Sequence, residues 1–423
     1  MQQTSKQLGP RVLDNLPAKT PRLVAASKST HHAEELIVAM ALEGHEQPSS
    51  HGSDYYRRNP RPISYVPGSE QMISGSSDKT VRKWDLQTGK EINEARVVCE
   101  KEVSAVAASR DGRWVITAGG YEPYDGNDND PGSAELKARE VKTGIMKTLK
   151  GHSRMVTSID ISADSMLLAS GSVDETARIW DLDTGKLVAG PLQCADTVGA
   201  VRFSQDSMKL AVKSYVGKCL QVWDIQGQKL DRRIGTFRNG VGHVTYAPVF
   251  WTMNDKSIVA AFTFTPLDEP KTIYEFDAST LDTVGVPFQG HTTVVTGLAL
   301  SFDYALLASA SYDHTIKLWA FGSRQLLASF DIRYPKALIL SPDLRHLAYT
   351  ALSDPKIYIC NVPPNILASI GSAQDAQSTV CIRCNNCAIP ALKSYCRAVY
   401  LTLHPEVIYS MYALILSLNY ATY

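Results

Sequence analysis

Short apolar segments separated by Gly, Asp and Ser turns recur along most of this chain. Where the pattern is clearest, apolar segments cover Val156 to Ile161, Leu167 to Ser170 and Thr176 to Asp181, and Leu187 to Leu192 follows them. Short segments with alternating or continuous apolar character, bounded by turn residues, are typical of β-strands. No helical periodicity of useful length lies between them. The pattern therefore predicts an all-β fold built from four-stranded units.

The pattern returns at a regular spacing. A Gly-His pair at residues 151–152 is followed by Asp174, 22 residues after the His, and by Trp180, six residues after the Asp; the same spacing recurs over residues 290–319. The Trp position can be followed through seven segments at intervals of 55, 41, 43, 53, 43 and 41 residues, at Trp84, Arg139, Trp180, Trp223, Phe276, Trp319 and Cys360. Four of these intervals match the period of a four-stranded propeller blade, and insertions lengthen the other two.

These repeats resemble the WD-repeat family of β-propellers over residues 36–370, most closely in the first, third and sixth repeats. The resemblance implies a seven-bladed β-propeller of four-stranded antiparallel blades. Such blades cover their apolar faces only when they are stacked and the ring is closed. We expect Leu36 to Leu42 to supply the closing outer strand, because it precedes a Gly-His pair as the other outer strands do. Ile366 to Ile370 is the alternative closing segment.

Three parts of the chain differ in composition. Residues 1–35 are polar and contain three prolines, so we expect a flexible tail. Residues 36–370 form the propeller. Residues 371–423 match no blade and are expected to form a Cys-containing apolar tail. Its cysteines do not fall into the two clean pairs of a structural zinc site, and residues 398–418 contain His, Pro and Glu near their start, so we expect neither a metal nor a membrane span there.

Composition and charge narrow the function. The 423 residues are 44% hydrophobic and 20% charged, with a formal net charge of zero. A global basic excess for nucleic-acid binding is therefore absent, although a local basic patch remains open. The first residues lack the apolar run of a signal peptide, and we expect an intracellular protein of the cytoplasm, the nucleus or both.

Three blades repeat one set of polar residues. Each set has a His, a Ser, an Asp and a Trp at a constant Ser-to-Asp and Asp-to-Trp spacing: His45, Ser74, Asp78 and Trp84; His152, Ser170, Asp174 and Trp180; His291, Ser309, Asp313 and Trp319. A catalytic triad is not expected three times in one chain. A buried indole N–H needs an acceptor, and a Ser–His–Asp chain supplies one while satisfying its own polar atoms. We interpret the quartets as structural.

The lengthened intervals indicate where we expect the protein to bind a partner. Insertions fall over residues 46–60, 121–133 and around 265–271, at connections that emerge from the same end of the blades. Loops at one end of a rigid scaffold are common binding sites. We expect partner contacts from Tyr55, Tyr56, Arg57, Arg58, Tyr121 and Tyr124. The acidic run at residues 125–130 lacks the Gly and Glu of an EF-hand and is expected to be a turn rather than a calcium site.

Family resemblance adds the residue before each quartet Asp as a contact position, at Ser77, Val173 and Tyr312, of which Tyr312 is the most contact-like. The leading hypothesis is a non-catalytic scaffold that binds peptides or proteins, with no cofactor and no small-molecule substrate. The alternatives are a nucleic-acid or chromatin-associated adaptor and a propeller enzyme. An enzyme would need ligands from several inner strands, which here offer small or apolar residues, with Asp160 and Arg202 as isolated charges.

Overall fold

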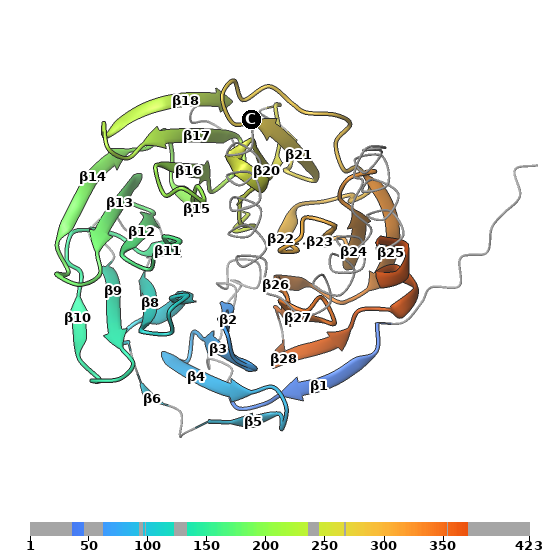
Figure 1. Ribbon diagram of the computed structural model, residues 1–423, viewed down its shortest axis with the longest axis horizontal. Coiled ribbons are helices and arrows are strands. Elements are labelled where there is room, and N and C mark those ends of the chain that lie inside the picture. The colour runs from blue at the N-terminus through green and yellow to red at the C-terminus, as the bar shows by residue number, and fades with distance from the viewer. Residues whose placement is uncertain are drawn as a thin grey trace, which may run out of the picture.

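A ring of antiparallel sheets surrounds a central channel in the computed structural model (Figure 1). The structure describes residues 36–45, 62–92, 96–97, 99–121, 133–235, 245–265, 268–352 and 354–370, with the backbone alone at residues 96–97 and 121. Seven sheets, here numbered as blades in chain order, make up the ring. The predicted all-β, seven-bladed propeller is therefore confirmed. The tails expected at residues 1–35 and 371–423 lie outside the described residues.

Each blade runs outward from an inner strand at the channel to an outer strand at the rim. Blade 1 contains β2 (Ile63–Val66), β3 (Gln71–Gly75), β4 (Thr80–Asp85), β5 (Lys90–Glu91) and β6 (Arg96–Val97). Blade 2 contains β7 (Glu102–Ala108), β8 (Trp114–Tyr121), β9 (Ser133–Glu140) and β10 (Met146–Thr148). Blade 3 contains β11 (Val156–Ile161), β12 (Leu167–Ser172), β13 (Thr176–Asp181) and β14 (Leu187–Gln193). Blade 4 contains β15 (Val198–Phe203), β16 (Lys209–Ser214), β17 (Cys219–Asp224) and β18 (Lys229–Gly235), and blade 5 contains β19 (Phe250–Trp251), β20 (Ser257–Phe262) and β21 (Thr272–Asp277). Blade 6 contains β22 (Val295–Leu300), β23 (Leu306–Ser311), β24 (Thr315–Ala320) and β25 (Gln325–Asp331). Blade 7 contains β26 (Pro335–Leu340), β27 (His346–Ala351), β28 (Asp354–Asn361) and β1 (Val38–Leu42).

The N-terminal strand closes the ring, as predicted. β1 pairs antiparallel with β28, with Leu42 opposite Ile357, so the first described strand is the outer strand of the last blade (Figure 1). The alternative closing segment lies in a helix over residues 364–370 instead. Helical spacing places Ile366 and Ile370 on one face, and both are buried in the cluster between blades 6 and 7. Their apolar character therefore reflects helix packing.

The Trp-type residues set the packing between blades. Trp180 lies opposite Leu168 in the pair β12–β13 and packs in the cluster that joins blade 3 to blade 2. Its neighbour Ile179 faces the other way, into the cluster between blades 3 and 4. Successive side chains of a strand point to opposite faces, so each third strand contributes to two interfaces. The core is consequently divided into clusters between blades.

Two blades depart from the regular pattern within the described residues. In blade 5 the fourth position has two isolated bridges, Ile273 to Phe288 and Phe276 to Thr283, in place of a continuous strand. In blade 1 the outer strand is split, because β5 and β6 each pair with a different part of β4. A three-residue 3-10 helix over Met253–Asp255 occupies the first turn of blade 5.

Hydroxyl groups in or shortly before the inner strands link consecutive blades around the channel. Thr157 Oγ1 of β11 donates to the carbonyl of Val198 in β15 at 2.6 Å, from a buried position. The same type of bond joins Ser104 to Val156, Thr245 to Val295, and Thr296 to Pro335. Each of these donors bonds a buried backbone carbonyl that would otherwise be costly to leave unpaired. They therefore help hold neighbouring blades in register.

Candidate functional site

The quartet residues of blade 3 are brought together in one hydrogen-bonded chain. Trp180 Nε1 donates to Ser170 Oγ at 2.9 Å, and Ser170 Oγ lies 2.8 Å from His152 Nε2. His152 Nδ1 lies 2.9 Å from Asp174 Oδ2. An indole only donates and a carboxylate only accepts. With a neutral imidazole, the serine therefore donates to Nε2 and His152 donates from Nδ1.

Blades 1 and 6 repeat this geometry closely. The Trp-to-Ser, Ser-to-His and His-to-Asp distances are 2.8, 2.7 and 2.9 Å in blade 1, and 2.9, 2.7 and 2.8 Å in blade 6. All three serines are fully buried: Ser74, Ser170 and Ser309. A hydroxyl that is buried and already bonded to an indole is not available to attack a substrate. The geometry favours a structural role over nucleophilic catalysis.

A threonine completes each network and was missed in the sequence. Thr176 Oγ1 donates to Asp174 Oδ1 at 2.6 Å, and the backbone N–H of Ser153 donates to Asp174 Oδ2 at 3.0 Å. The residue between Asp and Thr has a left-handed conformation in all three blades, at Lys79, Glu175 and His314. The repeated Asp-x-Thr spacing was the available signal. The position before each quartet His favours glycine because a side chain there would crowd the Trp ring: a Cβ at Gly151 would lie 3.0 Å from the Trp180 ring.

The quartet carboxylates are held in their charged form. Burial opposes ionisation of Asp174, but the hydrogen bond and charge of His152 and the hydrogen bonds of Thr176 and Ser153 outweigh it and hold the pKa well below its usual range. At Asp313, burial is likewise outweighed by His291 and Thr315, and the pKa is again lowered. Hydrogen bonds to an ionised carboxylate favour that form. The networks thus couple folding to deprotonation of these two groups.

Most of the predicted contact residues lie outside the described part of the chain: Tyr55, Tyr56, Arg57, Arg58 and Tyr124. Tyr121 is the last residue of β8, and only its backbone is described. Tyr312 lies between β23 and β24 and is half-buried. We use the term loop face for the side of the ring where strands two and three of each blade are joined and where the chain enters each inner strand. Tyr312 lies on this face.

Further tyrosines gather on the loop face near the channel. The rings of Tyr215 and Tyr246 meet edge to face, with centroids 5.1 Å apart. Burial, with a smaller contribution from Tyr215, raises the pKa of Tyr312 to about 12, so Tyr312 lies near Tyr215. Tyr246 also lines the channel. Tyr215 follows β16 as Tyr312 follows β23, but blade 4 has Gly217 in place of the quartet Asp, so counting back from that Asp did not identify Tyr215.

A second aromatic contact lies on the same face. The Tyr334 and His314 rings are 4.2 Å apart, and the guanidinium of the exposed Arg333 lies 5.8 Å from the Tyr334 ring. His314 follows Tyr312 by two residues, and Tyr334 immediately precedes β26 at the start of blade 7. Aromatic and cationic side chains therefore occupy this face over several blades.

Asp160 and Arg202, the two inner-strand charges, are not isolated, contrary to the sequence interpretation. Arg202 Nη1 and Asp160 Oδ1 form an ion pair at 2.9 Å across the inner strands of blades 3 and 4. The two residues are 42 apart, one blade period, and hold the same position in their strands, which was a usable signal. The channel cavity that these two residues line has a volume of about 490 Å³. Among the described residues, no three His, Cys, Asp or Glu side chains gather as they would around a metal ion.

No helix in the described ranges is both long and apolar enough to cross a lipid bilayer.

Comparison with known proteins gives matches at both the repeat and the chain level. The family model described as WD domain, G-beta repeat, matches residues 63–85, 144–181 and 282–320. WD repeat-containing protein SL1-17 of Schistosoma mansoni is 31% identical over 218 residues, which cover 50% of this chain and 67% of that protein. The guanine nucleotide-binding protein subunit beta of Nicotiana plumbaginifolia is 22% identical over 372 residues, covering 76% of this chain and 93% of that protein.

A third relative is matched over a shorter region. Eukaryotic translation initiation factor 3 subunit I of Bombyx mori is 26% identical over 207 residues, or 47% of this chain. The match spans 60% of the length of that protein. This chain therefore spans less than two thirds of the length of that initiation factor subunit.

Proposed function

Because this chain belongs to the WD-repeat family of β-propellers, we propose that it is a non-catalytic scaffold that binds peptide or protein partners on its loop face. WD-repeat propellers generally act as protein-interaction scaffolds. One observation carries the proposal for this face: Tyr215, Tyr246 and Tyr312 lie together beside the channel and are each only half-buried. The same proposal places the protein inside the cell, in the cytoplasm or the nucleus.

Tyrosine is suited to this task. Its ring offers a large contact area at a low cost in side-chain entropy, and its hydroxyl can bond a partner's backbone. Arg333 and His314 lie beside Tyr334 on the same face and can pair with an acidic side chain of the bound segment. We propose that the inserted loops add Tyr55, Tyr56, Arg57, Arg58, Tyr121 and Tyr124 to this surface.

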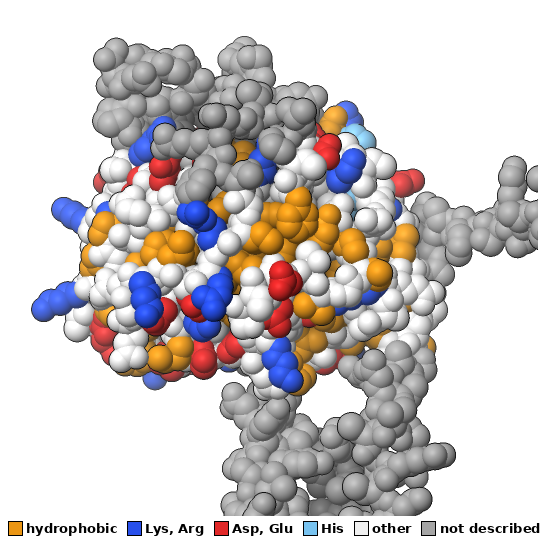
Figure 2. Space-filling model, turned by 90° about the horizontal axis from the view of Figure 1, so that it is seen from above, with side chains coloured by type: hydrophobic (Ala, Val, Ile, Leu, Met, Phe, Trp, Pro, Cys, Tyr) orange, Lys and Arg blue, Asp and Glu red, His pale blue; other side chains and the backbone are white. Residues whose placement is uncertain are grey.

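A nucleic-acid partner has less support. Basic and acidic side chains are interspersed over the rim that faces the viewer in Figure 2, and the chain has no net charge. Phosphate backbones are bound by surfaces with a clear excess of positive charge. The proposal therefore commits to proteins and peptides.

Affinity purification with quantitative mass spectrometry tests the proposal. The variant changes Tyr215→Ala, Tyr246→Ala and Tyr312→Ala together, and the matched control is Tyr304→Ala. Tyr304 is a half-buried tyrosine in the turn between β22 and β23, on the opposite face. We expect the triple variant to lose a defined set of partners that the control retains. An unchanged partner set, with both proteins folded, would overturn the assignment to the loop face.

A further inference from the structure

Blade 2 lacks the tryptophan that fills the equivalent interface in blades 1, 3, 4 and 6. In β13, Trp180 faces the preceding blade and bonds to Ser170. In β9 the same position, opposite Val115, is taken by Arg139. Alternation along β9 directs Arg139 toward blade 1, because its neighbour Ala138 is buried in the cluster with blade 3. The interface between blades 1 and 2 therefore receives a guanidinium instead of an indole.

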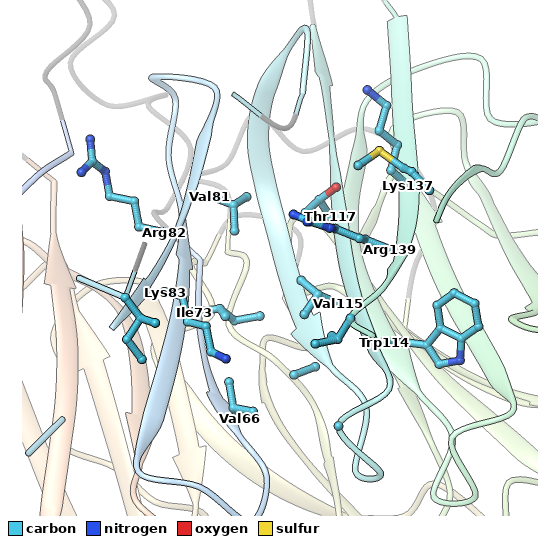
Figure 3. Close-up of a pocket in the computed structure, with 15 residues that line it drawn as sticks. Val66, Ile73, Val81, Arg82, Lys83, Trp114, Val115, Thr117, Lys137 and Arg139 are labelled. Atoms are coloured by element: carbon cyan, nitrogen blue, oxygen red, sulfur yellow. The ribbon is translucent and has the colours of Figure 1, made fainter. Parts of the chain in front are cut away.

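The consequence is an under-filled interface. The cluster between these blades contains only four buried apolar residues among those described, Ile73, Cys99, Val103 and Val106, fewer than any other cluster between blades. A groove with a volume of about 250 Å³ opens beside it, with apolar walls from Val66, Ile73, Val81 and Val115. Figure 3 shows Val81 and Val115 on opposite sides of this space, while Trp114 points away from it.

The charges that line the groove are of one sign. Among the described residues, its ionisable lining residues are Arg82, Lys83, Lys137 and Arg139, and none of the lining residues that the structure describes is acidic. Arg82 is paired with Glu91, and Lys137 with Glu135. The side chains of Arg139 and Lys83 form no hydrogen bond or ion pair with any residue that the structure describes. A half-buried cation without a partner on an apolar wall favours an anionic ligand group.

The other residues at the quartet positions of blade 2 do not neutralise the positive charge of the groove. Thr117 holds the quartet serine position, and Cys99, 18 residues earlier, holds the histidine position. The Cys99 thiol lies 3.6 Å from Thr117 Oγ1, and burial raises the pKa of Cys99 to about 11. The thiol is therefore neutral at physiological pH. It offers no counter-charge to Arg139.

We propose that the groove between blades 1 and 2 is a second binding site, which takes a peptide segment that carries a carboxylate next to a large aliphatic or aromatic side chain. The carboxylate pairs with Arg139, whose planar fork matches it in geometry, and Lys83 adds positive charge. The apolar side chain packs against Val81 and Val115, in the space that a tryptophan occupies in other blades. This site lies at the side of the ring and does not depend on the loop face.

A random-peptide display library panned on the full-length protein tests this inference. Peptides are first depleted on the Arg139→Trp variant, in which the indole fills the groove, and then selected on the unmodified protein. The enriched peptides are synthesised and titrated against the unmodified protein, Arg139→Gln, Lys83→Gln and the control Lys142→Gln. Lys142 is an exposed cation in the turn after β9 of the same blade. Arg139→Gln and Lys83→Gln keep the test usable if Arg139→Trp folds poorly.

We expect the enriched sequences to share an acidic residue next to a large apolar one. Their affinity should fall at least tenfold with Arg139→Gln, fall less with Lys83→Gln, and stay unchanged with Lys142→Gln. Replacing the peptide's acidic residue by its amide should reproduce the Arg139→Gln loss. The inference is overturned if no peptide is enriched, if the enriched peptides lack a carboxylate, or if they bind Arg139→Gln as well as the unmodified protein. Binding that is lost in the loop-face tyrosine variant instead would assign the peptides to that face.

Discussion

His152 and Asp174 are separated by 22 residues in the chain, yet His152 Nδ1 and Asp174 Oδ2 are 2.9 Å apart. The bond joins the loop before the inner strand β11 to the turn between β12 and β13. Both side chains are almost fully shielded from solvent. Because Ser170 and Trp180 continue the chain of bonds inward, one contact at the loop face is connected to the core of the blade.

The first prediction concerns Asp174→Ala. The substitution removes the acceptor of His152, Thr176 and the exposed Ser153 backbone, and leaves the buried donors of His152 and Thr176 unpaired. We expect a loss of ~1–3 kcal/mol in the free energy of unfolding, measured by urea denaturation. Asp282→Ala, at an exposed carboxylate outside any quartet, is the control and should change little. Equal stability of the two variants would argue against the network.

Acid lability follows from the lowered pKa of Asp174 and Asp313. A carboxyl whose pKa is lower in the folded state binds fewer protons there than in the unfolded chain, so its stabilisation is present above the unfolded pKa of ~3.9 and is lost as the pH falls below it. We expect the stability difference between the unmodified protein and the double variant Asp174→Ala and Asp313→Ala to be constant near neutral pH. It should shrink below about pH 4, as followed by urea denaturation over a pH series. A constant difference down to pH 2 would contradict the coupling.

A buried lysine in blade 4 should also make stability rise with pH, but in a more alkaline window. Lys213 is fully buried, and its Nζ lies 3.5 Å from the carbonyl and hydroxyl oxygens of Thr245. Burial lowers the pKa of Lys213 to about 7. The unfolded chain therefore binds the extra proton between pH 7 and the normal range of lysine, and stability should rise with pH across that window.

The matching substitution is Lys213→Met, which keeps the length of the side chain and removes the charge. We expect it to stabilise the protein by ~2–4 kcal/mol at pH 7, because each tenfold change in proton affinity corresponds to ~1.4 kcal/mol. The gain should diminish toward pH 10. Lys186→Met, at an exposed lysine, is the control. A destabilised Lys213→Met protein at neutral pH would show that the amine has a structural role.

The fold could be predicted from the sequence because its determinants are local and repeated. Trp180 and Trp319 recur at fixed distances from a Gly-His pair, and the strands between them show their period directly. Even Arg139 and Cys360, which share nothing chemically with tryptophan, were assigned correctly by spacing, as their partners Val115 and Leu347 confirm. The spacing therefore identified the position in the blade even where the type of residue differed.

The candidate sites could be predicted only in part, because they depend on contacts between blades. The groove beside Arg139 exists because the facing wall comes from blade 1, more than 50 residues earlier in the chain. The Tyr215–Tyr246 contact joins different blades in the same way. A repeat pattern shows what occupies each position but not which cavities remain between neighbouring repeats. Hence the departures from the pattern were visible, whereas the surfaces they create were not.

The inner ring of hydroxyls gives the last prediction, through Thr157→Val. Valine has nearly the shape of threonine, so the change removes the donor without opening a cavity. Thr157 Oγ1 lies 2.6 Å from the Val198 carbonyl of the next blade and 3.0 Å from the Gly171 carbonyl of its own. Losing a buried hydrogen bond should cost about 0.5–1.5 kcal/mol in the free energy of unfolding. The loss should be local to the junction of blades 3 and 4, because the donor bridges them. Hydrogen exchange should therefore quicken at amides of β11 and β15 more than elsewhere. Thr148→Val, at an exposed threonine of β10, is the matched control and should alter neither measurement. If exchange accelerates uniformly around the ring, the hydroxyl stabilises the propeller as a whole and not this junction.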